Sequence, residues 1–258
     1  MPTVSINIIT YNRANYLKEA IESILRQSFT DWELLILDGA STDNTSEVVA
    51  EFLSDQRIKY IRLTERTPNI PVARNIILQQ SQGEYVAVLD SDDVWCDDRK
   101  LAKQIKFLNE HQDYVLAGGG VILINSDSQE TGRYLNLGTD KQIRGSILSK
   151  NQFAHSSVVY RRAVALEVGR YNEALSIGED YDLFLRLGRQ GKVMNFPEYF
   201  LSYRVHSGSI CVADWLTGLS NNLLIIKKYR NDYPYYVFAY LRRLVRIIGG
   251  QLLSLVKK

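Results

Sequence analysis

The chain has 258 residues, 45% of them hydrophobic, and a formal net charge of +2. Its length suffices for one large core, or a core with a small appendage, and its hydrophobic content is ordinary for a globular protein. The near-neutral charge argues against a nucleic-acid binder. The two cysteines, Cys96 and Cys211, are too far apart in the sequence to indicate a disulfide framework or a zinc site. The sequence also has no uninterrupted run of about 20 apolar residues, the length that a helix needs to span a bilayer. We therefore expect a protein of a reducing, cytoplasmic compartment.

Strand and helix patterns alternate along the first 110 residues. We predict strands at residues 4–9, 32–37, 58–63 and 84–89, and helices at 15–27, 41–53, 71–80 and 98–109. This rhythm predicts an α/β fold with an open, mostly parallel, Rossmann-like sheet and helices on both faces. The carboxyl ends of the strands then share one edge, which is where such sheets bind ligands.

The pattern is less regular after residue 114. We predict strands at 114–125, 156–160 and 192–196, a helix at 181–189, a polar irregular segment at 131–150, and an exit from the core at 199–205. The glycines at 118–120 indicate a bulge or a close backbone approach. From about residue 212 the chain has a helical pattern with breaks at Tyr233-Pro234 and Gly249-Gly250. We therefore divide it into a main domain, 1–210, and a helical C-terminal extension, 211–258.

A cluster of acids follows the predicted fourth strand. The apolar residues 86–89 end in Asp90-Ser91-Asp92-Asp93. Carboxylates gathered at one point repel one another unless a cation lies among them. Oxygen ligands suit Mg²⁺ or Mn²⁺, and such ions usually also hold a substrate phosphate. The alternative is a solvated acidic loop before the helix at residue 98.

Three other polar loops lie at the same predicted edge, at residues 10–13, at 38–43 and at the helix start that carries Arg74. Each alone has an ordinary explanation, since Asp43 can cap a helix and an arginine is usually solvated or ion-paired. Together they surround one crevice with acids, an arginine and an aromatic ring. That composition suits a nucleotide, with an acid for the base or ribose, a ring for stacking and a metal ion for the diphosphate.

These segments, in this order, resemble the family 2 glycosyltransferases of the GT-A fold. The resemblance covers roughly residues 4 to 208. It is carried by VSINIITYNR at 4–13, LDGASTD at 37–43, ARN at 73–75, GEYVAVLDSDD at 83–93 with Lys100, Leu101 and Gln104, GEDYDLFLR at 178–186 and YRVH at 203–206.

The resemblance implies an inverting glycosyltransferase that uses a nucleotide-sugar donor with Mn²⁺ or Mg²⁺. It implies that Asp38 lies beside the nucleotide base, that Asp90 faces the ribose and that Asp92 holds the metal, with Asp90 as a further candidate metal ligand. Asp93 leaves the register of the metal ligand open by one residue, and His206 is implied to assist the metal or the leaving diphosphate. The remaining implied donor-site residues are Thr10, Tyr11, Asn12, Arg74 and Ser91.

Transfer with inversion requires a base that takes the proton of the acceptor hydroxyl, while a metal ion stabilises the leaving diphosphate. The resemblance implies that Asp180 is this base, with a helix N-cap as the alternative. Weaker acceptor candidates are Glu179, His155 and Trp95. His155 is equally well explained as a structural histidine, and Trp95 better explained as a packing residue below the site.

Gly39 and Ala40 stand where many relatives carry a second acid and then a glycine, which leaves Asp38 alone at the base. A uridine donor remains favoured, but the missing acid leaves guanosine and deoxythymidine donors open. Two alternatives to the transferase have the same fold. A sugar nucleotidyltransferase would need a Gly-rich basic loop after the first strand, which this chain lacks. A non-catalytic nucleotide-binding scaffold would not need the intact set of acids.

Residues 235–258 carry five cations, no acid and many apolar residues. A basic, apolar helix of this kind can lie on a membrane surface. The alternative is packing on the main domain or on another subunit of a homo-oligomer. We therefore expect a saccharide or lipid-linked acceptor in surface polysaccharide assembly, at the inner face of the membrane.

Overall fold

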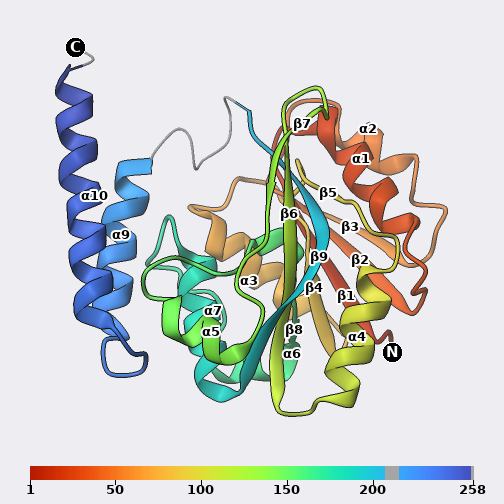
Figure 1. Ribbon diagram of the computed structural model, residues 1–258. Coiled ribbons are helices and arrows are strands. Elements are labelled where there is room, and N and C mark those ends of the chain that lie inside the picture. The colour runs from red at the N-terminus through yellow and green to blue at the C-terminus, as the bar shows by residue number, and fades with distance from the viewer. Residues whose placement is uncertain (207–214, 257–258) are drawn as a thin grey trace.

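The computed structural model describes residues 1–206 and 215–256, with side chains described for 1–206 and 218–248. A nine-stranded sheet forms the centre of the molecule in the order β3-β2-β1-β4-β8-β6-β9-β5, and β7 pairs with β6. Helices α1, α2 and α4 lie on one side of this sheet, and α3, α5, α6 and α7 on the other (Figure 1). Helices α9 and α10 form an outer layer beside the second group.

The first half of the chain folds as the periodicity predicts. Its first four strands are all parallel. The bounds are β1 Val4–Thr10, α1 Ala14–Leu25, β2 Trp32–Asp38, α2 Thr45–Ala50, β3 Ile58–Arg62, α3 Ile70–Gln80, β4 Tyr85–Val88 and α4 Lys100–Glu110. β1, β2 and β4 are buried along almost their whole length because helices cover both faces of a parallel sheet, whereas the edge strand β3 is partly exposed. A core between the sheet and α1 and α4 fixes the position of the loops at the carboxyl edge.

The predicted α/β fold with helices on both faces of the sheet is confirmed, and the second half adds antiparallel strand pairs to the parallel first half. β8 is antiparallel to both β4 and β6, β5 is antiparallel to β9, and β6 is parallel to β9. The bounds are β5 Val94–Trp95, β6 Tyr114–Ile124, β7 Glu130–Tyr134, α5 Asp140–Ser146, η1 His155–Ser157, β8 Val159–Arg161, α6 Arg162–Glu167, α7 Glu179–Gln190 and β9 Lys192–Arg204.

β9 is longer than predicted and includes residues 199–204, which were expected to leave the core. Pro197 cannot donate a ladder hydrogen bond, so the strand pattern in the sequence ends just before it. The sheet accommodates the proline by a register shift, since Gly118 pairs with Asn195 but Gly120 pairs with Tyr199. The strand therefore continues through a bulge to the end that carries His206.

The glycines in β6 allow the close approach that the sequence indicates. A Cβ atom on Gly119 would lie within 3.0 Å of the Phe200 ring, and one on Gly118 would lie within that distance of the Asn195 side chain. The polar segment 131–150 also contains two elements that were not predicted, β7 and α5. α5 starts with a capping box between Thr139 and Gln142, and its only buried side chain is that of Ile143.

The C-terminal extension contains α9, Trp215–Lys228, and α10, Tyr236–Val256. Tyr233-Pro234 separates the two helices as predicted, but α10 runs through Gly249-Gly250 without a break. The predicted boundary at residue 210 lies outside the described residues. Ile225, Ile226 and Tyr229 share a core with Leu183 and other α7 residues, so the extension packs on the main domain. No helix within the described residues is long and apolar enough to cross a membrane.

Candidate active site

The loops after β1 and β2 are joined at the carboxyl edge of the sheet. Thr10 and Asp38 are register partners at the ends of these strands. Beyond them, the Asn12 N–H donates to Ser41 Oγ at 2.9 Å, and the Thr42 N–H donates to Asn12 Oδ1 at 2.8 Å. Asn12 has a left-handed backbone, with φ of 52°. Asparagine tolerates that conformation better than most residues, so the turn is formed without glycine.

Asp38 forms the buried floor of this part of the site. It is fully buried, and its carboxylate accepts hydrogen bonds from the Ser41 N–H at 2.9 Å and the Tyr60 hydroxyl at 2.5 Å. Burial and the Asp38 charge raise the pKa of Tyr60, so this hydroxyl stays a donor. Above it, Thr10 Oγ1 is buried with no hydrogen-bond partner in the described part of the chain, and the Tyr11 ring lies under the Arg66 guanidinium at 4.2 Å.

Arg74 connects two acids from distant parts of the chain. Its Nη2 lies 3.0 Å from Asp90 Oδ1, and its Nε lies 3.2 Å from Glu179 Oε1. Arg74 lies on α3, whose N-cap is Asn69; the Asn69 side chain accepts a hydrogen bond from the Val72 N–H. Burial alone would raise the pKa of Asp90, but Arg74 and His155 hold that pKa well below its usual range. Asp90 is therefore a fixed carboxylate.

Asp92 and His206 lie side by side in the fold, although 114 positions separate them in the sequence. His206 Nε2 lies 2.9 Å from Asp92 Oδ2, and Arg13 Nε lies 3.8 Å from the same oxygen. The Asp92 side chain remains 23% exposed, whereas that of His206 is 8% exposed. The Tyr16 ring packs against His206 with 5.2 Å between centroids. A carboxylate and an imidazole thus share one partly open position.

Asp93 lies in a different environment from Asp92. It is 1% exposed, accepts from Ser156 Oγ at 2.6 Å and accepts from the Arg204 N–H at 2.9 Å. Burial, together with the nearby charges of Asp92 and Asp90, raises its pKa well above the usual value. Asp93 therefore faces the protein interior, while Asp92 faces His206.

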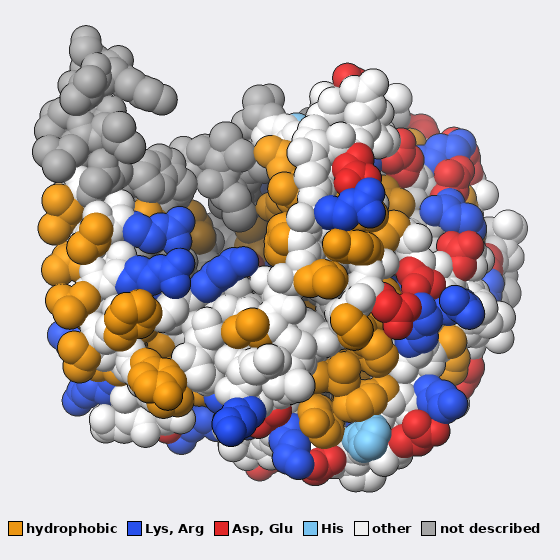
Figure 2. All heavy atoms as spheres, viewed as in Figure 1, with side chains coloured by type: hydrophobic (Ala, Val, Ile, Leu, Met, Phe, Trp, Pro, Cys, Tyr) orange, Lys and Arg blue, Asp and Glu red, His pale blue; other side chains and the backbone are white. Residues whose placement is uncertain are grey.

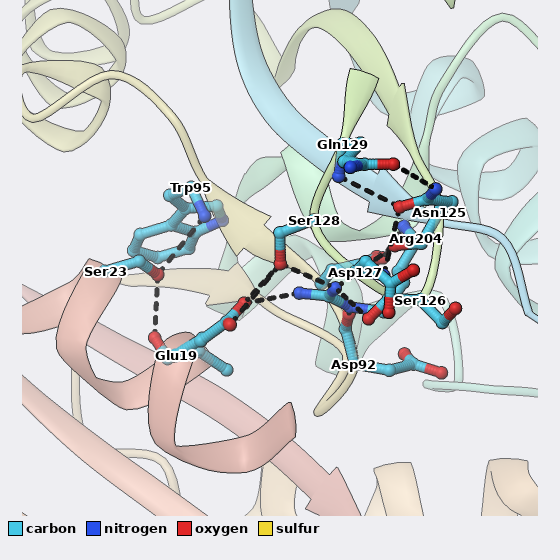
Figure 3. Close-up of polar contacts among 12 residues, drawn as sticks. Glu19, Ser23, Asp92, Trp95, Asn125, Ser126, Asp127, Ser128, Gln129 and Arg204 are labelled. Atoms are coloured by element: carbon cyan, nitrogen blue, oxygen red, sulfur yellow. Dashed lines mark hydrogen bonds and ion pairs between the residues drawn. The ribbon is translucent and has the colours of Figure 1, made fainter. Parts of the chain in front are cut away.

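Arg204 supports this acidic loop from beneath, a role that the sequence did not reveal. Its side chain is fully buried and donates to the Asp92 carbonyl oxygen at 2.8 Å, to Glu19 at 2.5 Å and to Ser128 Oγ at 2.9 Å. Figure 3 shows it between α1, the loop of Asp92 and the turn that joins β6 to β7. The only sequence signal was its place two residues before His206 in the YRVH segment.

Asp180 lies in the first turn of α7, beside Glu179. It is not the N-cap, because Gly178 occupies that position with a left-handed φ of 88°. Asp180 is partly exposed, and its Oδ2 accepts from Asn151 Nδ2 at a long 3.4 Å. Glu179, by contrast, is buried on Arg74, and burial raises its pKa. The two neighbouring acids therefore have separate environments.

The other predicted acceptor residues lie elsewhere. His155 is buried, with Nε2 3.0 Å from the Tyr171 hydroxyl and Nδ1 3.7 Å from Asp90 Oδ1, so it adjoins the first acid of the cluster. Trp95 is fully buried and its indole N–H donates to the Ser156 carbonyl at 2.7 Å. It packs below the site, the alternative that the sequence favoured, and its burial leaves no surface for stacking on an acceptor, so the weaker acceptor assignment is wrong. Ser91 is buried at 6% exposure.

No group of three or more His, Cys, Asp and Glu side chains is arranged to hold a metal ion within residues 1–206 and 215–256. Mg²⁺-type ions, however, are usually held by one or two carboxylates together with substrate phosphates. Asp92 with His206 fits that incomplete kind of site, since it offers one carboxylate oxygen and one nitrogen at a partly exposed position.

Comparison with known proteins identifies the family. Residues 5–169 match glycosyl transferase family 2. The chain is 28% identical over 245 residues to the putative glycosyltransferase EpsE of Bacillus subtilis, covering 91% of this chain and 86% of EpsE. It is 42% identical over 110 residues to the putative teichuronic acid biosynthesis glycosyltransferase TuaG of the same organism, covering 42% of this chain and 43% of TuaG.

Two solved structures share the fold. S. aureus TarS in complex with UDP-GlcNAc superimposes with a TM-score of 0.71 at 18% identity, over 93% of this chain and 72% of that one. Mannosyltransferase PcManGT from Pyrobaculum calidifontis, in complex with GDP-Man and Mn²⁺, gives 0.69 at 16% identity, over 97% and 75% of the two chains. The chain therefore belongs to glycosyl transferase family 2 and is a glycosyltransferase of the GT-A fold.

Proposed function

We propose that this enzyme is inverting and metal-dependent, and that it moves a sugar from a UDP-sugar to a hydroxyl of a saccharide or lipid-linked acceptor in surface polysaccharide assembly. The setting is supported by the teichuronic acid pathway named for TuaG. The donor class is supported by TarS with UDP-GlcNAc and PcManGT with GDP-Man. Membership of a transferase family sets aside both alternatives, the sugar nucleotidyltransferase and the non-catalytic scaffold.

The observation that carries the proposal is the separation of two kinds of acid. Asp92 lies with His206 and Arg13, where a diphosphate would meet a carboxylate, an imidazole and a guanidinium. Asp180 lies partly exposed at the start of α7 with one long hydrogen bond, so its carboxylate is available to a ligand. Arg74 connects the two regions through Asp90 and Glu179.

We assign the donor subsites from these contacts. The nucleoside would lie over Asp38. Beside it would be the exposed Tyr11 ring and Thr10 Oγ1, which has no hydrogen-bond partner among the described residues. Asp90 would accept from the ribose hydroxyls. Arg74 donates from Nη2 to Asp90 and from Nε to Glu179. We therefore propose that Arg74 positions these two acids instead of holding the donor phosphates.

Asp92 and His206 would hold the divalent cation, and the inward-facing Asp93 would not. Mn²⁺ or Mg²⁺ bound there would stabilise the charge that develops on the leaving diphosphate. Asp180 would accept the proton of the acceptor hydroxyl as its oxygen attacks the anomeric carbon from the side opposite the diphosphate, which inverts that carbon. Arg204 would keep Asp92 in place through its bond to the Asp92 carbonyl.

Asp180→Asn tests the assignment of the base. We expect transfer from a panel of UDP-sugars to fall by about 10² to 10⁴, the usual contribution of a general base, while UDP affinity measured by calorimetry stays within about twofold. Glu167→Gln, an exposed change on α6, is the matched control and should leave both unchanged. Transfer by Asp180→Asn within about tenfold of the wild-type rate would remove Asp180 as the base.

A further inference from the structure

Helix α10 has an apolar face that nothing in the described part of the chain covers. Exposed fractions on this face are 69% for Val237, 64% for Phe238, 54% for Leu241, 68% for Val245 and 49% for Ile248. The spacing of these five residues puts them on one side of a helix. Hydrophobic side chains line the outer edge of the molecule at this helix, with Lys and Arg side chains near them (Figure 2).

The opposite face of α10 is anchored to the catalytic domain. Ala239 is fully buried, and Arg243 is buried with Nε donating to the Leu148 carbonyl at 2.9 Å. Arg243 Nη2 also lies 3.2 Å from the hydroxyl of Tyr181, which follows Asp180 in α7. The orientation of the apolar face is therefore fixed relative to the active site, and the face is not a frayed end.

The charges on the exposed side have one sign. Arg242 and Arg246 are exposed. Arg242 follows Phe238 by four residues and Arg246 follows Arg242 by four, so the two arginines run along one border of the apolar face. Residues 235–258 contain no acid. If a second copy docked on this face, the helix would offer no carboxylate to pair with either arginine. An anionic surface meets both requirements, since it covers apolar side chains and neutralises the arginines that border them.

We propose that the outer face of α10 docks on the surface of an anionic lipid bilayer. Val237, Phe238, Leu241, Val245 and Ile248 enter the boundary between headgroups and acyl chains, and Arg242 and Arg246 contact lipid phosphates. The anchored Arg243 then holds the start of α7 in a constant orientation to the bilayer. The docking proposal does not depend on which donor or acceptor the enzyme uses.

Sedimentation of the full chain with vesicles tests the proposal. Vesicles of phosphatidylcholine mixed with phosphatidylglycerol should bind the wild type, and vesicles of phosphatidylcholine alone should bind it much more weakly. F238S/L241S/V245S should reduce binding to background. R242Q/R246Q should weaken it by about 30-fold, roughly fivefold for each arginine near an anionic surface.

Matched variants elsewhere on the surface are the controls. L25S/L53S/L166S removes three exposed leucines, and K106Q/K141Q removes two exposed cations; both should bind as the wild type does. Circular dichroism and UDP binding show whether each variant is folded.

Three results would overturn the proposal: no binding of the wild type to mixed vesicles, equal binding with and without phosphatidylglycerol, or undiminished binding of the α10 variants. A fourth such result would come from light scattering. If the wild type is a dimer and F238S/L241S/V245S is a monomer, the apolar face is a contact between two copies of the chain.

Discussion

Removal of the Arg74 side chain should strongly destabilise the fold, because it leaves two acids without their cation. The Arg74 and Glu179 side chains are 10% and 9% exposed, and their ion pair measures 3.2 Å. Breaking a buried pair by removing one partner costs about 3–5 kcal/mol, because the remaining charge stays desolvated. For a chain of this size, that loss corresponds to a melting temperature lowered by about 10 °C. Urea unfolding of Arg74→Ala at neutral pH measures the loss directly.

An exposed ion pair is the control for this experiment. Lys18 Nζ lies 2.6 Å from Glu51 Oε2, closer than Arg74 is to either acid, but the two side chains are 50% and 54% exposed. Lys18→Ala should therefore lower the free energy of unfolding far less than Arg74→Ala does, because solvent screens this pair. Arg74→Met with Glu179→Gln should recover part of the loss, since the double variant buries one charge fewer.

The pH dependence of the Arg74→Ala deficit has a defined sign. Arg74 helps hold the pKa of Asp90 low, so the stability this gives is present above the unfolded pKa of about 4 and disappears as pH falls. Burial raises the pKa of Glu179, so its charge is a cost that disappears on protonation. The deficit should therefore shrink from pH 7 toward pH 4. A deficit below about 1 kcal/mol at pH 7, or no recovery in the double variant, would refute this reasoning.

Two further predictions concern the support of the acidic loop and the sheet beneath it. Because the pKa of Asp93 is raised, the folded state loses stability as pH rises from about 4 through the folded pKa, so Asp93→Asn should gain stability relative to wild type over that range while keeping UDP affinity. Urea unfolding at a series of pH values measures this difference. If the free energies of unfolding of wild type and Asp93→Asn change with pH in parallel, the pKa of Asp93 is not raised and the prediction is wrong. Gly119→Ala should cost about 1–3 kcal/mol, since its Cβ would overlap the buried Phe200 ring; an unchanged melting temperature would contradict the close approach.

The extent of successful sequence prediction follows from the range of the interactions involved. Periodicity and capping are local, so the first four strands and helices were predicted in order. The course of β9 was not, because its continuation past Pro197 depends on a register shift against β6, which is distant in the sequence. α5 was missed because a single buried residue, Ile143, gives no helical periodicity.

The site shows the same limit at the level of single residues. Asp92 and Asp93 are chemically identical neighbours, and only contacts with Ser156 and Arg204, 63 and 111 positions away, turn one inward. The sequence therefore left the register of the metal ligand open. Packing of Trp95 below the site was favoured from the sequence, and its hydrogen bond to the Ser156 carbonyl agrees with that position. Arg204, by contrast, carries no local signal of its buried contacts.

The most direct test of the central claim is the metal dependence of UDP binding. Isothermal titration calorimetry of UDP, with Mn²⁺ and with a chelator, should show binding only when Mn²⁺ is present. Asp92→Asn should weaken that binding by at least about tenfold, because the variant loses the charged ligand that faces His206. Equal UDP affinity with Mn²⁺ and with chelator, or an unchanged affinity in Asp92→Asn, would contradict a cation held by this acid at the end of the fourth strand.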